Sequence, residues 1–458
     1  MTVGESCAPL NGMRRVASAL IAFGAIAAMT SACGGGGKDA NDPFGAGGGE
    51  WKTGPVDLRK MTTLIKVAPP RALKETFENI AARAQDPGLS RFFRAFAGGG
   101  SGSGFVMVRS QNGRDEEFVV TNRHVVQIAE DADIAFATGM GYENCEIVYT
   151  DPNHDLAVLA FPEGQRPVAF GLRPAAAPAK DRQTVVATGF PEMGGKPSYQ
   201  TTEGKVSNAE FVFEEEEGVK TTFIQHTAPI DPGSSGGPLT TEGGELLGVN
   251  TMFLRNKHSA FFAVPAKDVE AAVRAAFEIK VKRVNAAWRK QKLVEACKVL
   301  VGELESEDPK ISVIDDLISN HLVAEKGFES FKLVASNRAF LERFVEDPMD
   351  GMRKALLLRI LFRIKSNDMG GGLAPGNTCR DLAASDEAKI TTAQIVRMKL
   401  KLQNETIEIK WTFEHGHWKL AGGDFGDAGE NTPPPPPRQP PKQPPKQPPN
   451  DIPNPADG

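Results

Sequence analysis

The sequence predicts an all-β unit of the barrel or sandwich class, followed by a separate α+β domain. Between residues 100 and 265, short runs rich in β-branched and aromatic residues alternate with clusters of turn residues, as in barrels and sandwiches. After Lys280, apolar residues recur at helical spacing, and two later runs alternate between apolar and polar residues. A chain of 458 residues is long enough for about three such units.

The N-terminus predicts export. Arg14 and Arg15 precede an apolar run, Val16 to Met29, that is too short to span a bilayer comfortably, so residues 1–33 are interpreted as a signal peptide. The run ends in Thr-Ser-Ala before Cys33, which resembles a bacterial lipobox, in which the cysteine is lipidated and becomes the mature N-terminus. Cys33 would then anchor the protein to a membrane, on the periplasmic side or at the cell surface. Cleavage by ordinary signal peptidase near the same residue is the alternative.

Residues 34–70 are predicted to be a Gly-rich tether and residues 71–99 a helical segment. The apolar residues at helical spacing are Leu73, Phe77 and Ile80, and after a Pro-Gly break Leu89, Phe92, Phe93 and Phe96. The simpler interpretation is an amphipathic helix packed on its own domain. Self-association into a homo-oligomer is the other interpretation.

Residues 100–280 form the predicted β-rich unit. The clearest strands are residues 105–108, 118–121, 134–137, 156–161, 184–189, 246–252 and 260–264. Pro265 then opens a helix with Val269, Val273 and Phe277 on one face, which closes the unit.

Residues 283–424 are predicted to be an α+β domain of unknown function. Helical segments are expected at residues 284–304, 314–323, 340–345 and 352–364, and alternating runs at 396–402 and 407–413. His415 and His417 flank a turn glycine and lack a third ligand, so they are interpreted as a polar turn and no metal site is predicted. Residues 425–458 carry Pro-rich repeats that cannot form a core, which predicts a disordered or polyproline II tail.

Composition excludes one class of function. The net charge is −5, with Lys and Arg scattered among Asp and Glu, so no electrostatic footprint for nucleic acid is present.

Three segments of the β-rich unit carry the residue types that acyl transfer needs. His124 follows a strand-like run, Asp155 directly precedes the apolar run 156–161, and Ser235 lies in a glycine-rich turn. This chemistry requires a hydroxyl nucleophile, a base, a carboxylate that fixes the tautomer of the base, and donors for the oxyanion. Asp151, in the same Asp-Pro-Asn-His-Asp cluster, is the alternative carboxylate.

The glycines around Ser235 supply the last requirement. Gly233 and Gly236 permit a strained turn in which the backbone amides of Gly233 and Ser235 converge on one oxygen. A histidine after a strand, an aspartate before an apolar run or a Gly-rich turn is each a weak signal alone. Found together in one β-rich unit, they predict Ser235 as nucleophile, His124 as general base and Asp155 as the carboxylate that orients it.

Residues 100–278 resemble the protease domain of the HtrA (DegP) family of trypsin-like serine proteases. The matching segments are Gly-Ser-Gly-Phe at 102–105, Thr-Asn-x-His-Val at 121–125, Asp-Leu-Ala-Val-Leu at 155–159, Gly-x-Ser-Gly-Gly-Pro-Leu at 233–239, Gly-Val-Asn-Thr at 248–251 and Phe-Ala-Val-Pro at 262–265. The resemblance implies an all-β, chymotrypsin-like double barrel with two six-stranded barrels and the catalytic residues in the cleft between them. It implies no cofactor. It also implies that substrate pairs with the edge strand at Asn250, Thr251 and Met252, and that Ile230 lines a small apolar specificity pocket.

The sequence departs from that family in two places. No PDZ domain is recognised after residue 280, and Ser234 stands where the family usually has Asn. The predicted function is an exported serine endopeptidase of the cell envelope that cleaves unfolded or exposed polypeptide segments. The alternatives are a catalytically silent scaffold that binds a peptide or partner, and a C-terminal domain that is itself the functional part and is regulated by the protease.

Overall fold

The computed structural model describes residues 50–151, 153–166, 168–214, 220–253, 260–306, 314–334, 348–367, 395–401 and 406–423. All of them belong to one compact unit, residues 1–425, and residues 426–458 form a second unit of which no residue is described. The predicted signal peptide, Cys33, most of the Gly-rich tether and the Pro-rich tail therefore lie outside the described residues.

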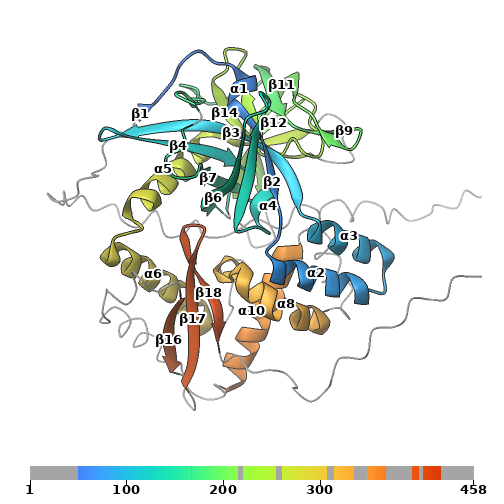
Figure 1. The fold of residues 1–458 in the computed structure, drawn as a ribbon, viewed down its shortest axis with the longest axis vertical. Helices are drawn as coiled ribbons and strands as arrows, with labels where there is room; N and C mark the ends of the chain where they lie inside the picture. Colours follow the sequence, from blue (N-terminus) through green and yellow to red (C-terminus); the bar gives the residue numbers. More distant parts are fainter. Residues whose placement is uncertain are drawn as a thin grey trace, which may run out of the picture. The chain divides into compact units, whose positions relative to one another are not determined.

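The first sheet closes on itself (Figure 1). Its strands are β1 (Glu50–Trp51), β2 (Thr62–Val67), β3 (Gly100–Gln111), β4 (Arg114–Thr121), β5 (Asp131–Phe136), β6 (Gly141–Asp151) and β7 (Leu156–Ala160). Their order is β1-β3-β2-β5-β6-β7-β4, and β4 also pairs with β3. The pairings from β3 through β2, β5, β6, β7 and β4 thus form a ring of six strands, with β1 added to β3.

β2 lies in the stretch predicted to be tether. It pairs with β3 on one side and β5 on the other, and so completes the ring. Two of its six residues, Thr62 and Thr63, are polar and yet fully buried. Threonine, isoleucine and valine favour strands, so the composition of this run fits a strand, and the run belongs to the folded unit rather than to the tether. The tether gives way to folded structure by residue 50 rather than at residue 70.

A second closed barrel follows. It has the order β11-β12-β15-β14-β13-β8. Its strands are β8 (Thr184–Gly189), β11 (Gln200–Glu214), β12 (Lys220–His226), β13 (Pro238–Thr240), β14 (Leu246–Phe253) and β15 (Phe261–Pro265), and the small hairpin of β9 (Glu192–Met193) and β10 (Lys196–Pro197) lies beside them in sequence. The two antiparallel six-stranded rings confirm the predicted double-barrel fold.

Helices and a third sheet make up the rest. The helices are α1 (Leu58–Met61), α2 (Arg71–Arg83), α3 (Pro87–Ala97), α4 (Arg123–Val126), α5 (Ala266–Lys282), α6 (Ala286–Glu305), the 3₁₀ turn η2 (Asp315–Leu317), α8 (Asn320–Val334) and α10 (Pro348–Asn367). The last sheet is an antiparallel meander of β16 (Ile395–Lys401), β17 (Thr406–Glu414) and β18 (His417–Gly423). This confirms the α+β region after the barrels. The helix predicted at residues 340–345 lies outside the described residues. In the part of the chain that the structure covers, every helix is too short or too polar to cross a bilayer.

The C-terminal elements share one apolar core with the first barrel rather than forming a separate core. This cluster contains side chains from the first ring, from helices α2, α3, α6, α8 and α10, and from the last sheet. Its members include Ile65, Phe77, Val106, Leu293, Met352, Trp411 and Leu420. α2 and α8 lie side by side (Figure 1), and Thr76 Oγ1 donates a hydrogen bond to the carbonyl oxygen of Ala324 at 2.8 Å. The apolar face of the N-terminal helices is thus covered within the same chain.

Candidate active site

The structure brings His124 and Asp155 into direct contact. His124 lies in α4, directly after β4, and Asp155 lies in the turn before β7 at a φ of 52°. His124 Nδ1 and Asp155 Oδ2 are 2.8 Å apart, and Asp155 Oδ1 accepts the His124 backbone N–H at 3.0 Å. A carboxylate oxygen accepts hydrogen bonds, so this contact favours the tautomer that carries the ring proton on Nδ1 and the lone pair of a base on Nε2.

Asp151, the alternative carboxylate, lies in a different set of contacts. It accepts the backbone N–H of Asn153 at 2.9 Å, and its Oδ2 is 3.0 Å from His154 Nδ1. Asp155 is therefore the candidate partner of His124, as the sequence predicts.

The second barrel contributes Ser235 and Thr251 to the same group. Thr251 Oγ1 donates to Asp155 Oδ2 at 2.6 Å, and Ser235 Oγ donates to the carbonyl oxygen of Thr251 at 3.1 Å. Thr251 thus contacts Ser235 through its backbone carbonyl oxygen and Asp155 through its hydroxyl, and so places Ser235 of the second barrel beside the His124–Asp155 pair of the first. The Asp155 side chain is 3% exposed and accepts three donors, whereas His124 is 34% exposed and can be reached by a substrate.

Two glycines of the turn around Ser235 have a positive φ and closely packed surroundings. Gly233 has a φ of 99°, and a Cβ there would lie 2.6 Å from the carbonyl oxygen of Phe190. Gly236 has a φ of 87°, and a Cβ there would lie 2.1 Å from the Ser103 carbonyl oxygen. Only glycine fits both constraints. Within the described residues, the backbone amides of Gly233 and Ser235 donate to no other protein group, so both N–H groups remain open to a ligand.

Ser103 is a candidate functional residue that sequence reasoning missed. Its fully buried hydroxyl donates to the Gly233 carbonyl oxygen at 2.6 Å and accepts the Phe190 N–H at 2.8 Å. Its backbone N–H donates to the Ser235 carbonyl oxygen at 2.8 Å. Ser103 thus fixes the peptide units on both sides of the turn. The Gly-Ser-Gly-Phe motif contains it, but the motif alone does not indicate this contact.

Two of the residues predicted to contact substrate, Asn250 and Ile230, have buried side chains. The Asn250 side chain is buried and donates to the carbonyl oxygens of Gly237 and Pro238, both at 3.1 Å, so it braces the turn. The backbone carbonyl oxygen of Asn250 accepts the Gly236 N–H at 2.8 Å. Ile230 is 7% exposed and belongs to the core cluster of the second barrel. Met252 lies in β14, and its side chain is outside the described residues.

Across the described ranges, no group of three or more His, Cys, Asp or Glu side chains is arranged to hold a metal ion.

The same part of the chain is similar to known serine peptidases. The family model of the trypsin-like peptidase domain matches residues 102–249. The serine protease Do-like HtrA of Lactobacillus helveticus is 31% identical over 180 residues, which cover 38% of this chain and 42% of that protein. A probable periplasmic serine endoprotease, DegP-like, of Pseudomonas fluorescens is 27% identical over 271 residues, which cover 58% of this chain and 53% of that protein.

Among solved structures, the active form of the Rv3671c protease from M. tuberculosis is 23% identical, with a TM-score of 0.35, and the match covers 47% of this chain and 81% of that one. The chain spans less than two thirds of the length of the two relatives above. Residues 102–249 are a trypsin-like peptidase domain, similar to the domains of HtrA and DegP serine proteases.

Proposed function

We propose that the protein is an exported serine endopeptidase in which Ser235 is the nucleophile, His124 the general base and Asp155 the carboxylate that orients it. The observation that carries this proposal is the contact of Thr251 with both Ser235 and Asp155, together with the direct contact of Asp155 with His124. The similarity of residues 102–249 to serine peptidases supports it.

The reaction follows the two steps of acyl transfer. Ser235 Oγ attacks the carbonyl carbon of the scissile peptide bond as its proton moves to His124 Nε2, which gives a tetrahedral intermediate. The C–N bond then breaks, the leaving amine takes the proton from Nε2, and an acyl-enzyme remains. Water repeats the sequence with His124 as base and releases the acid. Asp155 keeps the proton on Nδ1 and stabilises the imidazolium that forms in each step.

The open amides of Gly233 and Ser235 are the proposed oxyanion hole. Their N–H groups would donate to the oxygen that becomes negative in the tetrahedral intermediate. Each donor of this kind contributes about 10²- to 10³-fold to kcat in well-studied peptidases. Ser103 would keep the hole formed, because it holds the Gly233 carbonyl oxygen on the opposite side of the turn.

The proposed substrates are unfolded or exposed polypeptide segments in the cell envelope, bound along the strand that contains Thr251 and Met252. The relatives include probable periplasmic serine endoproteases, which supports export and polypeptide substrates. We place the anchor on Cys33, because the signal-like N-terminus ends in a lipobox-like sequence.

A fluorophosphonate probe tests the proposal without knowledge of the natural substrate. The purified protein should become covalently labelled, and a Ser235→Ala variant should not. Labelling should also fall by about 10³-fold or more in His124→Ala, because the base is lost. An unlabelled wild-type protein that binds peptides would instead indicate a catalytically silent scaffold.

A further inference from the structure

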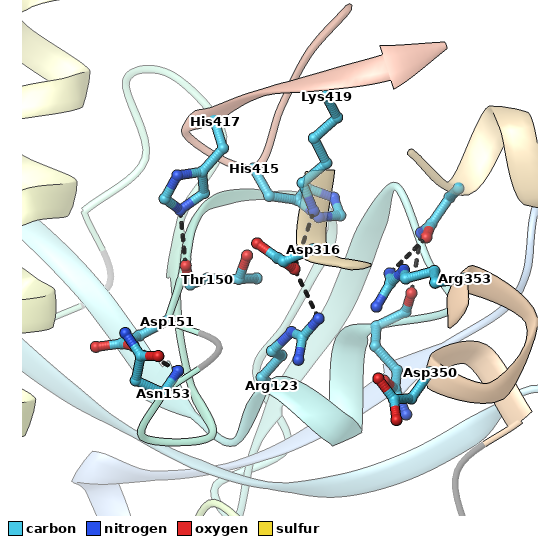
Figure 2. Close-up of polar contacts among 12 residues, drawn as sticks. Arg123, Thr150, Asp151, Asn153, Asp316, Asp350, Arg353, His415, His417 and Lys419 are labelled. Atoms are coloured by element: carbon cyan, nitrogen blue, oxygen red, sulfur yellow. Dashed lines mark hydrogen bonds and ion pairs between the residues drawn. The ribbon is translucent and has the colours of Figure 1, made fainter. Parts of the chain in front are cut away.

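The C-terminal region contacts the two segments that carry His124 and Asp155. The contacts come from η2 and from the turn between β17 and β18, and Figure 2 shows them together around Asp316. Arg123, Asp316 and Lys419 have buried side chains, and none of the three takes part in the chemistry proposed above.

Asp316 of η2 is the centre of the first contact. Arg123 Nη2 donates to Asp316 Oδ1 at 2.6 Å, and Lys419 Nζ lies 3.6 Å from the same oxygen. Figure 2 shows Asp316 between Arg123 and Lys419. The side chains of Arg123, Asp316 and Lys419 are 8%, 5% and 1% exposed. Burial alone would raise the pKa of the Asp316 carboxyl, but Lys419, Arg123 and Arg353 hold that pKa below its usual range, so the carboxylate is ionised.

Arg123 connects this carboxylate to the candidate active site. Its side chain binds Asp316, while its backbone N–H donates to the carbonyl oxygen of Asp155 at 3.0 Å. The next residue along the chain is His124. The position of Arg123 therefore affects both members of the His124–Asp155 pair.

Asn320 makes a second contact at the other end of α4. Asn320 Nδ2 donates to the carbonyl oxygen of Gln127 at 2.9 Å, and Arg353 Nη2 donates to Asn320 Oδ1 at 2.9 Å. α4 has only four residues, and a single helical turn is not stable without tertiary contacts. Asp316 and Asn320 thus hold the turn that presents His124 from both ends.

The β17–β18 turn makes a third contact, at the strand that leads to Asp155. His417 Nε2 donates to the Thr150 carbonyl oxygen at 2.9 Å, and the Thr150 N–H donates to the His415 carbonyl oxygen at 3.3 Å. A Cβ on Gly416 would lie 2.9 Å from the Val148 carbonyl oxygen, so the turn packs closely on β6. Thr150 pairs with Ala157 of β7, just after Asp155.

We propose that Asp316 is a positioning residue for the catalytic reaction: through Arg123 it holds His124 and Asp155 in register, and the C-terminal region is thereby part of the active enzyme. The inference rests on the proposed peptidase function. It assigns a role to residues 283–424 that requires no ligand of their own. Asp316 does not touch the reacting atoms, so its loss should slow the chemical step while a correctly folded substrate cleft remains.

The test uses the full-length protein and the rate at which a fluorophosphonate labels Ser235. Asp316→Asn keeps the shape of the side chain but removes its charge. We expect labelling to slow by about 10- to 100-fold, because a misplacement of about 1 Å costs about 10²-fold in rate. We also expect the midpoint of the rate–pH profile to move to lower pH, because a loosened His124–Asp155 pair stabilises the imidazolium less. For a peptide substrate, kcat should fall with KM changed less than about threefold.

Two further comparisons separate positioning from general destabilisation. Leu293→Ala removes a fully buried side chain of the shared core in α6, outside η2, α4 and β6, and it should keep the wild-type labelling rate and pH profile in the folded fraction. Arg123→Lys should retain more of the rate than Arg123→Met, because it keeps a cation beside Asp316. The comparison of Arg123→Lys with Arg123→Met also tests the proposal if Asp316→Asn does not fold.

The failures are distinguishable. If wild-type protein is not labelled at Ser235, the proposed function is wrong and this inference falls with it. If wild type is labelled and folded Asp316→Asn reacts within twofold of it, with an unchanged pH profile, the inference alone is wrong. Equal slowing by Leu293→Ala at matched stability would also overturn it, because the effect would then come from loss of stability.

Discussion

Substitution of Ser103 by alanine should slow the enzyme without touching any residue of the proposed triad. The hydroxyl holds the Gly233 carbonyl oxygen and the Phe190 N–H at 2.6 and 2.8 Å. Its removal leaves both groups without that partner, and an unsatisfied buried group costs about 1–3 kcal/mol. Gly233 is only half-buried, so water can replace part of the loss there. We expect the free energy of unfolding to fall by about 2–3 kcal/mol.

Part of that cost should appear as a population of turns in which the oxyanion hole is not formed. Each 1.4 kcal/mol corresponds to about tenfold in rate, and the loss of one oxyanion donor sets a ceiling of about 10²- to 10³-fold. Ser103→Ala should therefore lower the labelling rate and kcat/KM by about 10- to 100-fold. Both can be followed with a fluorophosphonate and an unfolded protein substrate, beside thermal unfolding.

Thr76→Val is the matched control. It removes another buried hydroxyl, which donates to the carbonyl oxygen of Ala324 at 2.8 Å and makes no contact with the Ser235 turn in the described residues. Thr76→Val should lower the free energy of unfolding but not the rate of the folded enzyme. If Ser103→Ala keeps kcat/KM within twofold of wild type, Ser103 does not hold the oxyanion turn.

Three more outcomes are expected. Burial lowers the pKa of His415 to about 4, so between pH 7.5 and 5 the unfolded chain binds a proton that the folded chain excludes, and the free energy of unfolding should fall by about 2 kcal/mol from this group. Asparagine tolerates the φ of 51° at this position, so His415→Asn should remove that part of the fall in unfolding experiments. Cleavage should follow Val, Ala or Ile, because Pro229 stands six positions before Ser235, where a preference for Arg or Lys needs a carboxylate, and Ile230 is apolar; a substrate profile dominated by Arg or Lys would contradict this. Cys33→Ser should move the protein out of the membrane fraction, and its recovery in membranes at wild-type levels would rule out lipid anchoring.

The sequence predicts the proposed triad because local motifs carry it. His124, Asp155 and Ser235 each lie at the end of an apolar run or in a glycine turn, so a short window identifies each residue type and its setting. Their contacts in the structure follow from the order of strands in the two barrels. The choice of Asp155 over Asp151 follows from the strand that begins directly after it.

The polar network around Asp316 could not be predicted in the same way. Arg123 and Asp316 are 193 residues apart in the sequence, and neither lies in a motif that indicates a partner. The polar pair His415 and His417 is typical of an exposed turn, but packing against β6 leaves both residues half-buried. Long-range burial of this kind is decided by tertiary packing, which local pattern does not contain.

Several strands were missed for a related reason. β11 alternates between half-buried and exposed residues along most of its length, so few apolar residues mark it. β2 has the β-branched residues of a strand, but it has only six residues and two helices separate it in the sequence from the next strand. The strands that were predicted, such as β7 and β15, are buried on both faces or nearly so and are apolar throughout.

The shared core also constrains the order in which the chain can fold. Its two halves are joined by contacts such as Thr76 with Ala324, 248 residues apart, and the whole second barrel lies between them in the sequence. A chain that emerges N-terminus first can pair the early strands, but their apolar faces stay exposed until β18 arrives. Contacts of such long range slow folding, because loop closure must precede the gain from packing. A chain that ends before residue 420 would therefore expose part of its apolar core, and chaperones and housekeeping proteases recognise such exposed apolar surface.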